Sequence, residues 1–253
     1  MEELKVLIVD DSSLARSIIS QILSEDSSVN VIGEADNGRS AVELAKQLKP
    51  NLITMDLHMP DMNCIEAIRQ IMHCCPTPIL VVTSKADAEA GFQAVSAGAL
   101  EVFDKADIAS TDYKSLLYKV RFLAKVKVIR HLQPQRLVNQ ANVLFPKSHP
   151  ISYVGIASST GGPKALSILL SSLPQSFRPP IIIAQHIGRQ FDVGLVSFLA
   201  GTTKKAVVLA RDNELIKPGY VYVAPADAHI AVRNNRFVSI SKTINDVYIP
   251  SAN

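Results

Sequence analysis

The sequence predicts an α/β protein built around two parallel β-sheets, and two patterns carry that prediction. Short apolar runs rich in β-branched residues alternate with amphipathic stretches of helical length. Strands that are apolar throughout belong to a sheet covered on both faces, and alternation of strand with helix makes such a sheet parallel. The alternation stops near residue 125 and restarts near residue 151. We therefore expect two domains, and a hydrophobic content of 47% is enough to fill two cores.

Residues 1–125 contain five strand and helix units, which is typical of a flavodoxin-like, doubly wound sheet of five strands. The expected strands are Val6–Val9, Val29–Ile32, Leu52–Met55, Ile79–Val82 and Glu101–Phe103. The expected helices are Ser13–Ser24, Ser40–Leu48, Ile65–Cys74, Ala88–Ala97 and Tyr113–Lys125. Ligands of such folds bind at the carboxyl ends of the strands, so we look for chemistry there.

Residues 126–150 have four basic residues, no acidic ones and weak periodicity, which predicts a linker. Residues 151–253 repeat the α/β pattern and form the second expected domain. Its expected strands are Ser152–Ala157, Ile181–Gln185, Ala206–Ala210, Tyr220–Ala224 and Phe237–Ser241. Its expected helices are Gly162–Leu173 and Phe191–Ala200.

Charge and composition exclude several classes of protein. Residues 1–125 carry a net charge of −6 and residues 126–253 a net charge of +9, which suggests different partners for the two halves. The basic half has no helix-turn-helix or zinc-finger pattern, so we expect an acidic protein partner and no nucleic acid. No apolar run is long enough to span a membrane, and the acidic N-terminus does not resemble a secretory signal, so we expect a cytoplasmic protein without membrane insertion. The three cysteines, Cys64, Cys74 and Cys75, predict free thiols on or near one helix.

Five chemically suitable side chains stand at strand ends in the first half. Asp10 and Asp11 follow the first expected strand, Asp56 follows the third, Thr83 the fourth, and Lys105 ends the fifth. Crowded carboxylates repel one another unless a cation joins them, and oxygen ligands suit Mg²⁺. Thr83 and Lys105 can then bind oxygens of a phosphoryl group transferred to Asp56. Any one acid at a strand end could simply cap the following helix, but five such side chains at four strand ends together favour a phosphoryl-transfer site.

The segments LIVDDS, ITMDLHMP, VVTS and FDK resemble the receiver domain of two-component response regulators. The resemblance implies that Asp10, Asp11 and Asp56 bind Mg²⁺, that Asp56 accepts phosphate from a histidine kinase, and that Thr83 and Lys105 sense it. The chain departs from the receiver pattern at three places. The usual Asp-Gly pair is Asn63-Cys64, where we expect a backbone suited to glycine. Ala106 replaces the usual proline, and Val102 replaces a frequent aromatic switch residue.

A second group of candidate catalytic residues begins in the segment GIASSTGG, which runs from a strand into a helix. Ser159 at the top of that strand, with the loop Thr160-Gly161-Gly162, faces backbone N–H donors that can stabilise an oxyanion. The same loop could bind phosphate, or could be only a cap and a turn. His186 follows the next strand, and adjacent parallel strands would bring it near Ser159 as a general base. His229 is the one rival base, and the other histidines are expected to be structural.

Together GIASSTGG and IIIAQHI resemble the catalytic domain of the CheB family of chemotaxis protein-glutamate methylesterases. The order receiver, linker, hydrolase agrees, so the second domain is expected to be a Rossmann-like α/β hydrolase domain that is incomplete. The resemblance implies that Ser159 attacks glutamate methyl esters or glutamine amides on the cytoplasmic helices of chemoreceptors, with His186 moving the proton and no cofactor in the hydrolase. Phosphorylation of Asp56 would relieve inhibition by the receiver docked over these two residues.

The resemblance leaves the third member of the triad open. Family members extend about a hundred residues further, and their triad acid lies in that part, so the chain looks truncated at its C-terminus. The acids after residue 125 are Asp192, Asp212, Glu214, Asp227 and Asp246. Asp227 near His229 is the one considered as a substitute. Loss of the orienting acid costs serine proteases about 10⁴ in turnover. The alternative function is therefore a phospho-receiver signalling module whose hydrolase remnant is catalytically dead and only binds partners.

Overall fold

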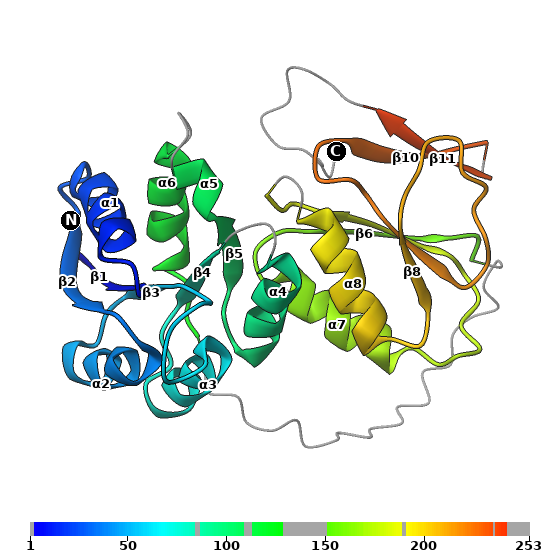
Figure 1. Ribbon diagram of the computed structural model, residues 1–253. Coiled ribbons are helices and arrows are strands. Elements are labelled where there is room, and N and C mark those ends of the chain that lie inside the picture. The colour runs from blue at the N-terminus through cyan, green and yellow to red at the C-terminus, as the bar shows by residue number, and fades with distance from the viewer. Residues whose placement is uncertain are drawn as a thin grey trace. The chain divides into compact units, whose positions relative to one another are not determined.

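The structure is a computed structural model that describes residues 3–83, 87–108, 113–128, 151–188, 191–234 and 236–241. It divides the chain into two compact units, Met1–His131 and Leu132–Asn253 (Figure 1). Both units contain a parallel sheet flanked by helices, so the α/β fold class is confirmed. Most of the predicted linker, residues 129–150, lies outside the described residues, and the domain boundaries of the sequence analysis remain predictions.

Unit one is a five-stranded sheet with the order β2-β1-β3-β4-β5 and parallel pairing throughout. Its strands are β1 (Leu4–Val9), β2 (Val29–Ala35), β3 (Leu52–Met55), β4 (Ile79–Thr83) and β5 (Glu101–Asp104). Its helices are α1 (Ser13–Ser24), α2 (Gly38–Leu48), α3 (Cys64–Cys74), α4 (Ala88–Ala97), α5 (Lys105–Ile108) and α6 (Lys114–Leu123). All five strands and five of these helices were expected; the short α5 was not.

Both faces of this sheet are covered, as the uniformly apolar strands predicted. Helices α1 and α6 pack on one face, where Ile19, Leu116 and Val120 meet Val6 and Leu80 in one buried cluster. Helices α2, α3 and α4 lie side by side on the other face (Figure 1). Burying apolar side chains on both faces is the main stabilising contribution to such a sheet. The carboxyl ends of β1, β3, β4 and β5 are thereby held at one edge, where the candidate residues lie.

Side-chain caps explain where three helices of unit one begin. The Ser12 hydroxyl accepts from the N–H of Ala15 at the start of α1. Asn37 accepts from the N–H of Ser40 at the start of α2, and Asn63 from the N–H of Ile65 at the start of α3. Each cap satisfies one N–H that the helix itself cannot bond.

One expectation about the α3 start is wrong. Cys64, expected at a position suited to glycine, is the first residue of α3 and has helical backbone, while the positive φ of this loop, 68°, belongs to Asp61. Aspartate tolerates the left-handed region better than most side chains, which explains why no glycine is needed. Cys64 and Cys74 begin and end α3, Cys75 follows, and all three thiols are free, as expected.

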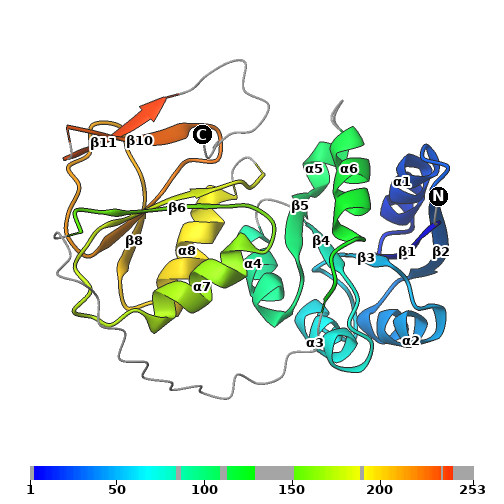
Figure 2. The same ribbon diagram turned by 180° about the vertical axis from the view of Figure 1, so that it is seen from behind.

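Unit two contains a four-stranded parallel sheet with the order β6-β7-β9-β8. Its strands are β6 (Val154–Ser158), β7 (Ile181–Gln185), β8 (Ala206–Leu209) and β9 (Tyr220–Val223), and its helices are α7 (Gly162–Ser172) and α8 (Asp192–Thr202). The two helices pack against each other (Figure 2). Strand β6 is an edge strand of this sheet within the described residues, and β7 is its neighbour.

The sequence analysis missed a strand in unit two. β10 (His229–Arg233) pairs antiparallel with β11 (Phe237–Ser241) as a separate two-stranded ribbon, so His229, the rival base, begins a strand. The ribbon packs on the sheet through the fully buried ring of Tyr222. β10 was missed because its apolar run, 230–232, is only three residues long and lies between His229 and Arg233. Unit two therefore has α7 and α8 together with an antiparallel ribbon around its sheet.

None of the helices in the described ranges has the length and apolar character needed to cross a bilayer.

Candidate functional sites

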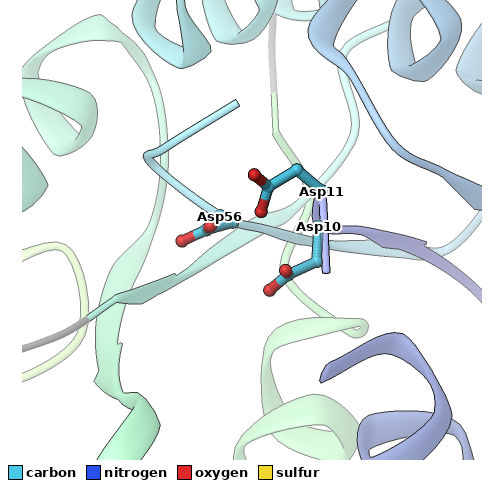
Figure 3. A group of neighbouring side chains, drawn as sticks. All are labelled: Asp10, Asp11 and Asp56. Atoms are coloured by element: carbon cyan, nitrogen blue, oxygen red, sulfur yellow. The ribbon is translucent and has the colours of Figure 1, made fainter. Parts of the chain in front are cut away.

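The three aspartates of unit one converge because their strands are in register. β1 and β3 are parallel neighbours with Val9 opposite Met55, so Asp10 and Asp56 follow at the same level of the sheet. The N–H of Asp56 donates to the carbonyl oxygen of Val9 at 2.9 Å, which fixes that level. Figure 3 shows Asp10, Asp11 and Asp56 gathered at this edge, with one carboxylate oxygen of each within 4.8 Å of the others. Asp10 and Asp56 are buried, and Asp11 is exposed.

Lys105 joins the two buried carboxylates. Its Nζ lies 2.8 Å from Oδ2 of Asp10 and 3.0 Å from Oδ2 of Asp56. Lys105 was expected to end the fifth strand, but β5 ends at Asp104 and Lys105 begins α5. The remaining carboxylate oxygens accept backbone hydrogen bonds, Asp10 from Ser12 at 3.0 Å and Asp56 from Leu57 at 2.8 Å. Each buried acid is thus paired with a charge and a backbone donor, as a buried ion requires.

Burial and pairing shift the ionisation of this cluster in opposite senses. Burial raises the pKa of Asp56 above its ordinary value, and the hydrogen bond and charge of Lys105 offset this only in part. For Lys105, burial acts to lower the pKa, but the hydrogen bonds and charges of Asp10 and Asp56 together raise it. The cation therefore stays charged at neutral pH, where it neutralises one of two adjacent carboxylates.

Thr83 is the last residue of β4 and is completely buried. Its hydroxyl oxygen has no hydrogen-bond partner among the described residues. A buried hydroxyl without a partner costs free energy, so native structures normally give it one. The Thr83 hydroxyl at this sheet edge can therefore still form a hydrogen bond to a ligand.

In unit two, β6 and β7 bring Ser159 and His186 together. Ser158 is opposite Gln185 in the parallel register, so the next residues, Ser159 and His186, leave the sheet at the same level. The hydroxyl oxygen of Ser159 lies 3.4 Å from Nδ1 of His186. Ser159 is exposed and His186 is half-buried, so the hydroxyl faces solvent. The expectation that adjacent strands place these two side chains within reach of each other is met.

The loop after Ser159 turns sharply into α7. Gly161 has φ of 75°, a conformation that glycine adopts at little cost, and is the N-cap of α7. The N–H of Gly162 donates to the carbonyl of Ser159 at 2.8 Å and so closes the turn. Pro163 occupies the first turn of the helix, where a missing N–H does no harm. Thr160 is half-buried within the same loop.

The sequence analysis gave no role to Gln185, and the structure places it at the centre of this site. Only 2% of this residue is exposed, and its side chain forms hydrogen bonds at the ends of both strands, β6 and β7. Oε1 accepts from the Ser158 hydroxyl at 2.6 Å, and Nε2 donates to the carbonyls of Ser159 and His186 at 2.8 and 2.9 Å. The sequence signal was available: an amide that ends a fully apolar, buried strand must find partners.

The acids considered for the triad have other partners where the structure describes them. Asp192 accepts from the N–H groups of Val193 and Ala226, and Asp212 from that of Ile240. Glu214 accepts from the N–H of Arg211. These three carboxylates therefore stabilise loops and a helix start. Asp227 lies between β9 and β10, and Asp246 lies outside the described residues.

Comparisons with known proteins find relatives of both units. Residues 6–111 match the family model of the response regulator receiver domain, and residues 154–253 that of CheB methylesterase. A protein-glutamate methylesterase/protein-glutamine glutaminase of Myxococcus xanthus is 39% identical over 95% of this chain and 71% of its own length. A relative of the same name from Thermotoga maritima is 34% identical over 96% of the chain and 74% of its length.

Among solved structures, the response regulator domain of Thermotoga maritima CheB is 34% identical, with a TM-score of 0.46, and covers 50% of this chain and 99% of that one. The receiver match lies over the acid cluster, and the methylesterase match lies over Ser159 and His186. The alignments with the Myxococcus xanthus and Thermotoga maritima relatives run across both units of this chain. The chain therefore belongs to the CheB family of protein-glutamate methylesterases/protein-glutamine glutaminases, with a receiver domain ahead of the methylesterase domain.

Proposed function

We propose that this chain hydrolyses methyl esters of glutamate side chains, and the amides of glutamine, on chemoreceptor helices, and that phosphorylation of Asp56 controls the rate. The observation that carries the proposal is the pair Ser159 and His186, 3.4 Å apart and facing solvent at the ends of adjacent parallel strands. A nucleophile and a base within reach of each other are the signature of covalent hydrolysis. The family to which the chain belongs supports the same chemistry.

In the proposed reaction, the Ser159 oxygen attacks the ester carbonyl while His186 takes the hydroxyl proton. That proton passes to the leaving methoxide, which departs as methanol, and water then releases the glutamate from the serine ester. His186 accepts at Nδ1 only in the tautomer whose proton is on Nε2. The separation of 3.4 Å is looser than a productive hydrogen bond, as is common before substrate binds.

The loop Thr160-Gly161-Gly162 is proposed as the oxyanion and substrate loop. The N–H of Gly162 is already bonded to the Ser159 carbonyl. The donors to the oxyanion would therefore come from the rest of the loop, Thr160 and Gly161. The net charge of +9 on residues 126–253 complements receptor helices rich in glutamate, which favours association with them.

The acid cluster is proposed as the phosphorylation site of a receiver. Three carboxylates with oxygens within 4.8 Å of one another are a donor set that fits Mg²⁺, so Asp10, Asp11 and Asp56 would hold that ion. When bound, the ion neutralises charge on the transferred phosphoryl group. Asp56 would accept the phosphoryl group from a histidine kinase, and Lys105 would bind one of its oxygens. The unsatisfied hydroxyl of Thr83 is suited to another.

Methanol release from methylated receptor tests the hydrolytic part. We expect release by the chain and a loss of at least about 10³-fold in Ser159→Ala, since the nucleophile itself is removed. The control is phosphate incorporation at Asp56, which Ser159→Ala should leave intact. If the chain incorporates phosphate but releases no methanol, the alternative of a receiver with a catalytically dead, partner-binding remnant holds.

The regulatory part has its own test. A small-molecule phosphodonor with Mg²⁺ should stimulate methanol release by the wild type and not by Asp56→Asn, which lacks the acceptor oxygen. Stimulation is the ratio of two rates of the same variant, so it is independent of that variant's basal rate. Equal stimulation of the two proteins would contradict a role for Asp56.

A further inference from the structure

The buried amide of Gln185 makes three hydrogen bonds, and all of them end in the two segments that carry Ser159 and His186. Its carbonyl oxygen accepts from Ser158, and its two N–H groups donate to the main-chain carbonyls of Ser159 and His186. With 2% of the residue exposed, water cannot replace these partners. The full set of bonds is what a buried primary amide requires.

The position of these bonds in the sheet matters more than their number. The last main-chain bond between β6 and β7 runs from the N–H of His186 to the carbonyl of Ser158. Beyond it the two segments diverge, Ser159 into the turn before α7 and His186 into the loop before α8. The Gln185 side chain spans this point and holds both carbonyls at once, so it continues the connection between the strands by one more residue.

A neighbouring glycine is shaped to this amide. A Cβ added at Gly162 would lie 1.9 Å from Oε1 of Gln185 and 3.0 Å from Cβ of Ser158. Such a contact is impossible without moving the amide or the turn. Gly162 therefore makes room for Gln185, and the turn, the amide and the strand end form one packed unit.

We propose that Gln185 is a positioning residue for the hydrolytic pair: it fixes the backbone of Ser159 relative to that of His186 and so sets the approach of the hydroxyl to the imidazole. This inference rests on the proposed function. Of the side chains of this size, only glutamine offers two N–H donors for the two carbonyls together with an oxygen that accepts from Ser158. Glutamate has the same shape but would set a carboxylate against two carbonyl oxygens, and methionine fills the space without any donor.

The test compares Gln185→Glu and Gln185→Met with two controls in the full chain. We expect kcat for methanol release to fall by about 100-fold with KM changed by less than about twofold, because an error near 1 Å in placement costs that much. Labelling of Ser159 by a fluorophosphonate, which reports the reactivity of the hydroxyl without substrate, should slow by a similar factor. Ser158→Ala keeps both N–H bonds and should lose less than about fivefold. Gln175→Glu, the same change at an exposed site of unit two, should have no effect.

Two results would overturn the proposal. One is a folded Gln185→Met variant, judged by its thermal unfolding, that keeps kcat and the labelling rate within a few-fold of the wild type. The other concerns the wild type alone and applies even if the variants do not fold. The side-chain N–H protons of Gln185, followed by nuclear magnetic resonance, should exchange with solvent far more slowly than those of Gln175. Equal exchange rates would mean that the amide holds neither carbonyl.

Failure of the proposed function would look different. If the wild type neither releases methanol nor labels at Ser159, hydrolysis is refuted, but the resonances of the His186 ring still report its position. They should shift in Gln185→Met and stay unchanged in Gln175→Glu. Unchanged ring resonances in both variants would refute the positioning role separately.

Discussion

The two sites of this molecule share one arrangement of strands, but charged groups hold one site together and an uncharged amide holds the other. In each, residues that follow two adjacent parallel strands meet at the carboxyl edge of a sheet. In unit one the side chains that meet are charged, and Lys105 holds Asp10 and Asp56 together by ion pairs of 2.8 and 3.0 Å. In unit two they are a hydroxyl and an imidazole, and the uncharged amide of Gln185 holds the backbone behind them.

The difference suits the chemistry proposed for each site. A site that receives a phosphoryl group and a divalent cation needs charges that can be exchanged for those of the ligands. A site that moves one proton between a hydroxyl and an imidazole needs a fixed distance between those two groups. The buried hydrogen bonds of the Gln185 amide provide it. Substitutions that remove a charge should therefore destabilise unit one most. Substitutions that disturb the packing around the site should destabilise unit two most.

The largest expected effect is that of Lys105→Met, which leaves Asp10 and Asp56 buried side by side without their cation. We expect the free energy of unfolding to fall by about 2 kcal/mol at pH 7 in a chelator, less than for a fully buried pair because the lysine is partly exposed. Mg²⁺ should then stabilise the variant more than the wild type, since the cation no longer competes with the lysine. Urea unfolding with and without Mg²⁺ measures both, and equal stabilisation would contradict a shared site.

The next effect separates two glycines of unit two. Gly162→Ala forces a Cβ into Gln185 and should cost about 1.5 kcal/mol, which lies in the lower half of the range for overpacking. Gly155→Ala is the matched control: it lies in β6 with nothing within 4 Å of the added Cβ, so stability should be unchanged or slightly raised. Thermal unfolding of the two variants checks this, and equal losses would show that the contact with Gln185 is unimportant.

A smaller effect is expected at Tyr222 in β9, the strand on which the ribbon packs. The buried hydroxyl of Tyr222 accepts from the N–H of Lys217 at 2.9 Å, and that hydrogen bond ties the chain before β9 to the core. Tyr222→Phe should lower stability by about 1 kcal/mol because one donor loses its partner. Tyr153→Phe, at a ring that is 41% exposed, serves as the control. Denaturant unfolding of both variants should show a loss only at Tyr222.

The smallest expected effect is a dependence on pH. Because the pKa of Asp56 is raised in the folded protein, the stability that its neutral form contributes is fully present below pH 3.8 and is lost as pH rises through the raised value. Asp56→Asn removes this loss, so in a chelator the variant should gain on the wild type as pH rises from about 4 toward neutrality. Unfolding measured across this range tests the sign, and a variant that loses stability relative to the wild type as pH rises would contradict it.

The sequence by itself determined the parallel sheets and nearly every helix and strand, and it selected the candidate residues that the structure brings together at both sheet edges. Apolar runs fix strands, caps such as Ser12 fix helix starts, and the rule that ligands bind at strand ends selects Asp56 and Ser159. Two elements escaped it, since α5 has four residues, too few for a helical period, and the apolar run of β10 has only three.

Only the tertiary structure decided how the site residues are held. That Asp192 and Asp212 bond to the N–H groups of Ala226 and Ile240, and that Gln185 joins Ser159 to His186, are outcomes of contacts between distant segments. The physical reason is one of range. A local pattern records the period of an element and its caps, whereas the partner of a buried polar group depends on which strands become neighbours and in which register.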